Sequence, residues 1–400
     1  MNAQLTPQPT LGSLFWIFFK IACTSFGGFM AMISVTENVV VERKKLMSHR
    51  AMLDGISLAS ILPGPVAVNL VVYVGYRLRG GMGALLSALG AVSPSFVFIM
   101  VLSLAYFQWG QVPAVNRLFM GFIPAVSAII VSAAWNMSRK SIAGWREALI
   151  AVIAASILLV VGGFYSTLAI IVGAGVIGWL WLGPTNATAP ESAQTDTTKT
   201  ARAKSKFDIN AIFIGAAPLT ALPLWQFDPG ILLKLFFVFA GMSLMLFGGG
   251  YVFIPLIQEI VVNGHGWVSR QEFVDAIAMG QITPGPILVS AAFIGLKVAG
   301  LAGAVVATLG IYLPSALLMV ASTHMLERIK HSRVIAAALC GVRPSVIGMV
   351  AAAAFTVGWS APHHWGSVLI FAAALVALLR LRIEVVWIIP VAGLAGLALF

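Results

Sequence analysis

Long apolar stretches, separated by short polar loops, follow one another along almost the whole chain. Each half contains six of them, and many approach or exceed the roughly 20 residues that a helix needs to cross a bilayer. Their approximate bounds are 12–36, 53–76, 82–108, 117–138, 147–163 and 165–183 in the first half, then 231–258, 274–297, 301–325, 333–358, 364–380 and 382–400 in the second. The pattern predicts an all-α polytopic membrane protein.

The helix-breaking positions inside these stretches occur twice. Phe26-Gly27-Gly28 and Pro63-Gly64-Pro65 return as Phe247-Gly248-Gly249 and Pro284-Gly285-Pro286, both 221 residues later. Further matched pairs follow at that offset or, after one residue is lost, at 220: Ser48 and Ser269, Asp54 and Asp275, Gly75 and Gly295, Arg77 and Lys297, Gly80 and Gly300, Gly83 and Gly303, Gly90 and Gly310, Pro94 and Pro314, Gly121 and Gly341, Pro124 and Pro344. Such a duplication in an apolar chain is typical of transporters built from two structural repeats, with the site between them.

The segment that joins the two repeats differs from both. We expect the repeats at 12–183 and 231–400, joined by a polar linker at 184–208 that is rich in Thr, Ala and Lys. That composition is typical of disordered or weakly ordered chain. A thirteenth apolar stretch at 209–226 then predicts one connecting transmembrane helix, which adds the odd crossing needed to invert the second repeat.

Composition agrees with this class and leaves little room for others. Hydrophobic residues make up 60% of the chain, charged residues 9%, and the mean hydropathy is +0.98, far from the values of soluble proteins. The two cysteines, Cys23 and Cys340, both lie in apolar segments, so no disulfide framework is expected. The first eleven residues contain no Lys or Arg, which argues against a cleavable signal peptide. The net charge of +11 is explained by basic cytoplasmic loops rather than by nucleic-acid binding.

The distribution of Lys and Arg predicts the orientation. The loop near 107–116 carries neither and is expected outside, whereas its counterpart carries Arg328, Lys330 and Arg333 and is expected inside. Corresponding loops therefore face opposite sides, so the repeats have inverted topology. We expect a multi-pass protein of the cell inner (plasma) membrane, with the linker and most Lys/Arg loops in the cytoplasm.

The first two segments of each repeat allow two topologies. If both crossed the membrane fully, in a protein of thirteen spanning helices, a basic cluster would lie outside: Arg43, Lys44, Lys45 and Arg50. If both are re-entrant hairpins, broken at Gly-Gly and at Pro-Gly-Pro, the loops at 37–52 and 77–81 become cytoplasmic. We favour the re-entrant topology, which leaves three cations near the outer face: Arg117, Arg270 and Lys297.

The breaks are the first candidate site. Proline removes a backbone donor and glycine adds freedom, so a Pro-Gly-Pro triplet cannot continue a helix. Freed backbone groups at membrane depth are tolerated where they are buried in protein or line a polar cavity, and a new helix N-terminus suits an anion. A kink that eases packing is the alternative. We therefore predict substrate binding at the two sets of breaks, Gly27, Gly28, Pro63, Gly64 and Pro65 with Gly248, Gly249, Pro284, Gly285 and Pro286.

Polar side chains beside the breaks are the next candidates. Each could donate a hydrogen bond to an oxyanion or satisfy a helix interface instead. They are Ser25, Ser60, Asn69, Gln281, Thr283 and Ser290. Arg343 lies inside an apolar segment where its repeat partner is the neutral Ile123, so it either balances substrate charge or extends toward the membrane surface.

Two matched carboxylates, Asp54 and Asp275, are candidates for proton coupling. Each lies early in the helix that leads to a Pro-Gly-Pro triplet, and a residue there can also simply favour the helix dipole. Ser269 and Glu272 form a capping-box pattern that places the start of the second of these helices.

Motifs of catalysis are absent from the sequence. It contains no Gly-x-Ser-x-Gly, no phosphate-binding P-loop, no His-Glu-x-x-His and no Cys-x-x-Cys. The adjacent His363 and His364 project in different directions, so a metal site there is not expected. We predict a protein that is not an enzyme and has no catalytic residues, metal or cofactor.

Three motifs of the second repeat, Phe247–Pro255, Gly280–Pro286 and Thr308–Ser315, strongly resemble the chromate ion transporter family. The first repeat matches through Ser25–Gly28, Val41–Lys44, Leu62–Pro65 and Tyr73–Tyr76. The resemblance covers both repeats, as in the long, two-domain form of the family.

That resemblance implies a secondary transporter that exports chromate from the cytoplasm and gives chromate resistance, with substrate binding at the matched breaks. Sulfate is a structural analogue and a second candidate partner, and membrane lipid surrounds the protein. A sulfate or other anion carrier and a non-transporting membrane scaffold are the alternatives, and the oligomeric state is left open.

Overall fold

The computed structural model describes residues 9–25, 29–109, 112–142, 144–182, 228–247, 250–325, 332–359 and 361–400. Within these ranges every regular element is a helix. The predicted linker at 184–208, the predicted connecting helix at 209–226 and both Gly-Gly pairs (Gly27-Gly28 and Gly248-Gly249) lie outside the described residues.

The helices follow the predicted segments in each half. The first half contains α1 (Leu11–Thr24), α2 (Phe29–Glu37) with the π-helical turn η1 (Asn38–Arg43), α3 (His49–Ile61), α4 (Val66–Trp109), α5 (Pro113–Ser141), α6 (Trp145–Val160) and α7 (Gly163–Ile177) with η2 (Gly178–Leu182). The second contains α8 (Pro229–Met245), η5 (Gly250–Val252), α9 (Phe253–Ile257), η6 (Gln258–Gly264), α10 (Arg270–Ile282), η7 (Ile287–Val289), α11 (Ser290–Thr323), α13 (Arg333–Trp359), α14 (Trp365–Leu379) and α15 (Val385–Leu399).

Both Pro-Gly-Pro triplets end one helix and begin another. Helix α3 stops at Ile61 before the first triplet, and α10 stops at Ile282 before the second. Gly64 and Gly285 have φ values of 112° and 108°, in the left-handed region that favours glycine. The chain folds back at each break. After the first triplet, the ring of Tyr73 in α4 packs on Gly55 of α3, and after the second, the Ser290 hydroxyl donates to the Ala276 carbonyl of α10.

A second fold-back occurs inside α4 and inside α11. Gly80 and Gly300 share one conformation, φ 61° and ψ −153°, which divides each helix into a short arm and a long arm. The arms touch so closely that a Cβ on Gly75 would lie 2.4 Å from the carbonyl oxygen of Gly83. Gly303 meets Gly295 in the same way, so the two halves share this hairpin as well.

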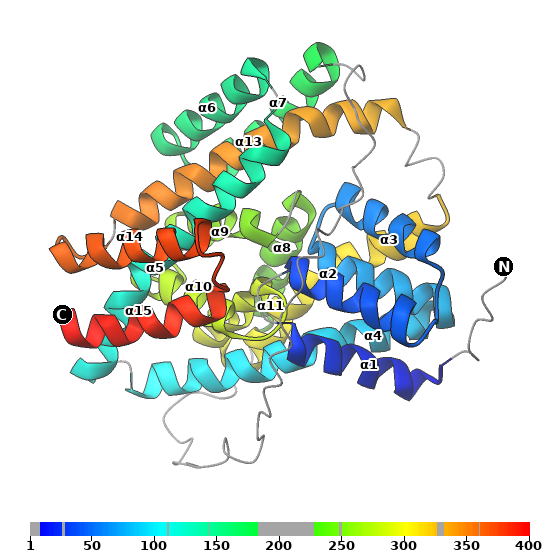
Figure 1. Cartoon of the computed structure of the whole chain (residues 1–400), viewed down its shortest axis with the longest axis horizontal. Helices are drawn as coiled ribbons and strands as arrows, with labels where there is room; N and C mark the ends of the chain where they lie inside the picture. The colour runs from blue at the N-terminus through cyan, green and yellow to red at the C-terminus, as the bar shows by residue number, and fades with distance from the viewer. Residues whose placement is uncertain are drawn as a thin grey trace.

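The last helices of each half pack on the other half (Figure 1). Helix α5 lies beside α14 and α15, and a Cβ on Gly121 would lie 2.2 Å from the carbonyl oxygen of Ala392. Helix α13 lies beside α6 and α7, with Gly341 against Ala174 in the matching contact. Small residues that let helix backbones approach closely are typical of packing within membranes.

Four helical stretches of the described chain are long and apolar enough to cross a membrane: Val66–Trp109, Val115–Arg139, Ile287–Thr323 and Arg333–Trp359. Large apolar side chains cover the outer helices, among them Val160 at 83% exposed, Val368 at 69% and Trp387 at 67%. Exposed apolar surface of this extent suits lipid and not water. The chain is therefore an all-α polytopic membrane protein, as its hydrophobic pattern predicts.

Candidate functional site

The two Pro-Gly-Pro breaks meet between the halves. The backbone N–H of Gly64 donates to the carbonyl oxygen of Leu246 at 2.7 Å, and that of Gly285 donates to Ser25 at 3.1 Å. Ser25 and Leu246 are the C-terminal caps of α1 and α8, directly before the two Phe-Gly-Gly segments. Each triplet is therefore tied by its own glycine to the interrupted helix of the opposite half.

The two triplets meet at a place that we call the crossing. Two serines that pack there were not among the candidates from the sequence. The buried hydroxyl of Ser95 donates to the Pro284 carbonyl oxygen at 2.5 Å. A Cβ on Gly285 would lie 2.2 Å from the Ser95 hydroxyl, and one on Gly64 would lie 2.2 Å from the Cβ of Ser315. Ser95 and Ser315 follow the matched prolines Pro94 and Pro314. Their equal spacing in both halves was the available signal.

The predicted polar side chains lie at the breaks, but most are bonded to nearby backbone. Ser25 donates to Ile21, Thr283 to Gly280, and the Asn69 amide to the Pro63 carbonyl oxygen. Ser290 bonds across the hairpin as described above, and Ser60 donates to Ile56 within α3. These contacts fix the shape of the breaks.

Two buried amide atoms remain without a partner beside the triplets. They are the Oδ1 of Asn69 and the Nε2 of Gln281. Buried polar groups are almost always paired in native structures, so each unpaired one requires a reason. The Tyr251 hydroxyl lies near the Gln281 amide, and a role for this amide in anion binding stays a prediction.

Arg343 takes part in none of the contacts described above. It is half-buried on α13, between Gly341 and Gly348, which pack against α7 and α6. Among the described residues, no hydrogen bond or ion pair joins Arg343 to either break. Its role in balancing substrate charge stays a prediction.

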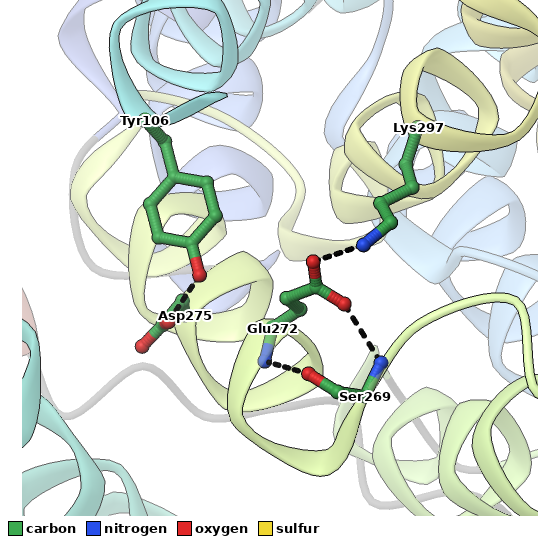
Figure 2. Close-up of polar contacts among 5 residues, drawn as sticks. All are labelled: Tyr106, Ser269, Glu272, Asp275 and Lys297. Atoms are coloured by element: carbon green, nitrogen blue, oxygen red, sulfur yellow. Dashed lines mark hydrogen bonds and ion pairs between the residues drawn. The ribbon is translucent and has the colours of Figure 1, made fainter. Parts of the chain in front are cut away.

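Among the described residues, Asp275 is the most deeply buried carboxylate (Figure 2). Its side chain is buried, with 1% exposed. The Tyr106 hydroxyl, at the end of α4, donates to Oδ2 at 2.8 Å, and the Gln271 amide donates to Oδ1 at 2.9 Å. A residue of the first half thereby holds the matched carboxylate of the second.

The capping box at the start of α10 is confirmed. The Ser269 hydroxyl accepts from the Glu272 N–H at 3.2 Å, and the Glu272 carboxylate accepts from the Ser269 N–H at 2.8 Å. The same carboxylate forms an ion pair with Lys297 of α11. Burial raises the pKa of Glu272, but the hydrogen bonds from Lys297 and from the Ser269 backbone outweigh it and hold the pKa below its usual range.

These residues surround a cavity of about 440 Å³. Its lining comes from both halves: Tyr106, Asn116, Phe119, Ser269, Gln271, Glu272, Asp275 and Lys297. The ring of Tyr106 packs edge-on against Phe119 and Phe293, with centroids 4.9 and 5.4 Å away, which fixes its hydroxyl above Asp275. The buried carboxyl group of Asp275 and the ion pair of Glu272 with Lys297 therefore line the same cavity.

Asp54, the counterpart of Asp275, has different surroundings. It is half-buried on α3, and Arg50, Ala51 and Arg77 occupy the positions of Gln271, Glu272 and Lys297. Neither the paired glutamate nor the capping box exists there, although Ser48 still caps the helix by accepting from the Ala51 N–H.

A family model described as "Chromate transporter" matches the chain twice, at residues 12–179 and 233–397. A "Probable chromate transport protein" of Synechococcus elongatus is 30% identical over 98% of this chain and 96% of the relative. The "Chromate transport protein" of Cupriavidus metallidurans is 29% identical over 88% of this chain and 84% of its own length. That of Pseudomonas aeruginosa is 28% identical over 100% of this chain and 95% of its own length. No solved structure matches.

Proposed function

The chain belongs to the chromate transporter family, and from that premise we propose that it is a secondary transporter that exports chromate from the cytoplasm and gives chromate resistance. Its homologues are transporters and the chain is not an enzyme. The observation that carries the proposal is the reciprocal contact of the breaks, Gly64 with Leu246 and Gly285 with Ser25.

We propose that the substrate binds at this crossing. A helix that begins after a Pro-Gly-Pro triplet presents unpaired N–H groups and the positive end of its dipole, which favour an anion. Two such helix starts lie at the crossing, one from each half, with the Gln281 amide beside them. Thus a tetrahedral oxyanion would find donors from both halves.

The transport cycle follows from the proposed repeats, 12–183 and 231–400, in inverted orientation. The family model matching once in each half supports the duplication. The fold-backs at Gly55 and Tyr73 and at Ala276 and Ser290 support re-entrant hairpins rather than fully spanning helices. Movement of these elements around the crossing would expose the site to each side in turn.

Membrane voltage favours the proposed direction. Moving one charge across 100 mV is worth about 2.3 kcal/mol, so a dianion gains roughly twice that on leaving a negative cytoplasm. Asp54 and Asp275 are the candidates for coupling this movement to protons. The proposal places the protein in the inner (plasma) membrane with the polar linker in the cytoplasm.

The test is chromate uptake into energised inside-out membrane vesicles, with sulfate as competitor. We expect accumulation that Gly285→Ala abolishes, because alanine meets both an unfavourable φ and the Ser95 hydroxyl. Gly241→Ala is the matched control, since a Cβ there meets no atom within 4 Å. Uptake equal to that of vesicles without the protein would refute chromate export. Sulfate uptake without chromate uptake would favour the other anion carrier.

A further inference from the structure

The cavity around Asp275 lies outside the crossing of the breaks and has its own composition. It takes Tyr106, Asn116 and Phe119 from the first half and the remaining lining from the second. A water occupies about 30 Å³ in the liquid, so about 440 Å³ holds a tetrahedral oxyanion with several waters. Lys297, Gln271 and Asn116 carry N–H groups on its walls, while the Tyr106 hydroxyl donates to Asp275.

Two exposed arginines lie next in the chain to residues that line this cavity. Arg117 follows Asn116 and Arg270 precedes Gln271, and both arginines are exposed. Together with Lys297 they are the three cations that the favoured topology leaves near the outer face. Positive charge that the topology does not require is a signature of a pathway for anions.

The acids of the cavity decide its net charge. Glu272 is paired with Lys297, so these two charges cancel. Asp275 has no cation beside it among the described residues, and its hydrogen-bond partners Tyr106 and Gln271 are neutral. An ionised Asp275 leaves a negative cavity that repels a dianion, whereas a protonated Asp275 leaves a neutral one lined with donors.

We propose that this cavity is an oxyanion-binding vestibule on the outer side of the transport path and that it binds a dianion together with a proton on Asp275. The proposal rests on the proposed function, because it supplies that transporter with its outer site and its coupling ion. Burial of a carboxylate disfavours the charged form, and the two neutral donors offset only part of this cost. Both protonation states of Asp275 are therefore accessible.

Linkage makes the consequence reciprocal. If a proton strengthens anion binding, then the anion strengthens proton binding by the same factor. Above the pH at which Asp275 loses its proton, anion affinity falls by about tenfold per pH unit. Adding the anion to the protein in weak buffer draws protons from solution.

The experiment uses the purified full chain and sulfate, which stays divalent from mildly acidic to mildly alkaline pH. Binding of labelled sulfate is measured across this range, with proton uptake followed by an indicator dye. We expect wild-type affinity to fall with pH, and Asp275→Asn to bind at the low-pH affinity throughout with no proton uptake. Glu42→Gln, which neutralises an exposed carboxylate on η1 outside the cavity, is the control and keeps both responses.

A second variant keeps the test decisive if Asp275→Asn does not fold. Tyr106→Phe removes a donor to the charged form of Asp275, so the fall in affinity moves to higher pH. Sulfate binding that is independent of pH, or a pH response that survives in Asp275→Asn, overturns the vestibule and leaves chromate export standing. Failure of export with vestibule binding intact would instead overturn the proposed function.

Discussion

The helices that lead to the two Pro-Gly-Pro triplets, α3 and α10, begin alike and end alike but carry different chemistry between. Serine caps both, an aspartate follows six residues later in both, and both are followed by a triplet whose glycine has a φ near 110°. Yet Asp275 is buried under Tyr106 beside a paired glutamate, whereas Asp54 is half-buried, with Ala51 at the position of that glutamate. The backbone has been kept equal in both halves while the side chains around one carboxylate have diverged.

The contrast separates two requirements of the proposed mechanism. Two equal breaks are needed because each closes on the opposite half. One proton-binding carboxylate is sufficient to couple the cycle, so the second is free to change its surroundings. Backbone substitutions should therefore act equally in the two halves, and carboxylate substitutions unequally.

The largest effect is expected from the glycines of the triplets. Gly64→Ala and Gly285→Ala should each abolish chromate uptake and lower the stability of the purified protein by several kcal/mol. A left-handed conformation costs roughly 1–2 kcal/mol, and overpacking typically adds about 1–3 kcal/mol. The loss of stability is measured by thermal unfolding, followed by size-exclusion chromatography. Normal uptake by either variant would contradict the expectation that both triplets are required.

The carboxylates should give the next largest effect, and an unequal one. Asp275→Asn is expected to reduce proton-coupled uptake by about tenfold or more, within the usual range of coupling between two ligands. Asp54→Asn should change it by about twofold or less, as for most partly exposed positions. The measurement is chromate uptake driven by an imposed pH gradient, with voltage-driven uptake as reference. Equal losses in both variants would contradict the assignment of coupling to one half.

Substitution of Ser95 and of Ser315 should change stability by different amounts, but the difference should be smaller than for the carboxylates. Ser95 donates across the interface to Pro284, but the Ser315 hydroxyl donates to Tyr312 within its own helix at 3.2 Å. Loss of a buried hydrogen bond typically costs about 1 kcal/mol, so Ser95→Ala should destabilise more than Ser315→Ala. Denaturation midpoints of the two variants, compared with wild type, test this order.

The smallest effect is expected from the glutamate that the first half lacks. Glu272→Gln removes the ion pair with Lys297, whose side chain is 35% exposed, while glutamine can keep the capping box. Such partly exposed pairs contribute about 0–1 kcal/mol. Because the pKa of Glu272 is lowered in the folded protein, its stabilisation is present above the ordinary carboxyl pKa and is lost as pH falls through the folded value. Between those two pKa values, the folding stability of the Glu272→Gln variant should therefore change less with pH than that of the wild type.

Local sequence signals predicted the elements of the fold. The apolar stretches gave the helices, Pro-Gly-Pro gave the ends of α3 and α10, and the serine–glutamate pair gave the first turn of α10. Each signal acts on the residues that carry it or on their immediate neighbours. The first predicted segment, 12–36, contains two helices, α1 and α2, and the Gly27-Gly28 break predicted inside it lies outside the described residues.

The parts of the site that escaped prediction depend on distant residues. Tyr106 lies 169 positions from Asp275, and Ser95 lies 189 positions from Pro284. Neither belongs to a motif, and a tyrosine or serine in an apolar helix is common. Matched spacing could have indicated Ser95 and Ser315, but Tyr106 has Leu326 at its counterpart position, so no repeat signal marks it.

The exchange of terminal helices between the halves has a consequence for how such a protein could diversify. Gly121 of α5 packs against α15, and Gly341 of α13 packs against α7. Each half therefore supplies packing contacts that the other half lacks by itself. Two separate chains would have to find each other by diffusion, whereas a covalent link holds them at an effective concentration of order millimolar. Association then no longer requires identical partners. Fusion thus frees one copy to acquire a proton site while the other retains only the shared frame.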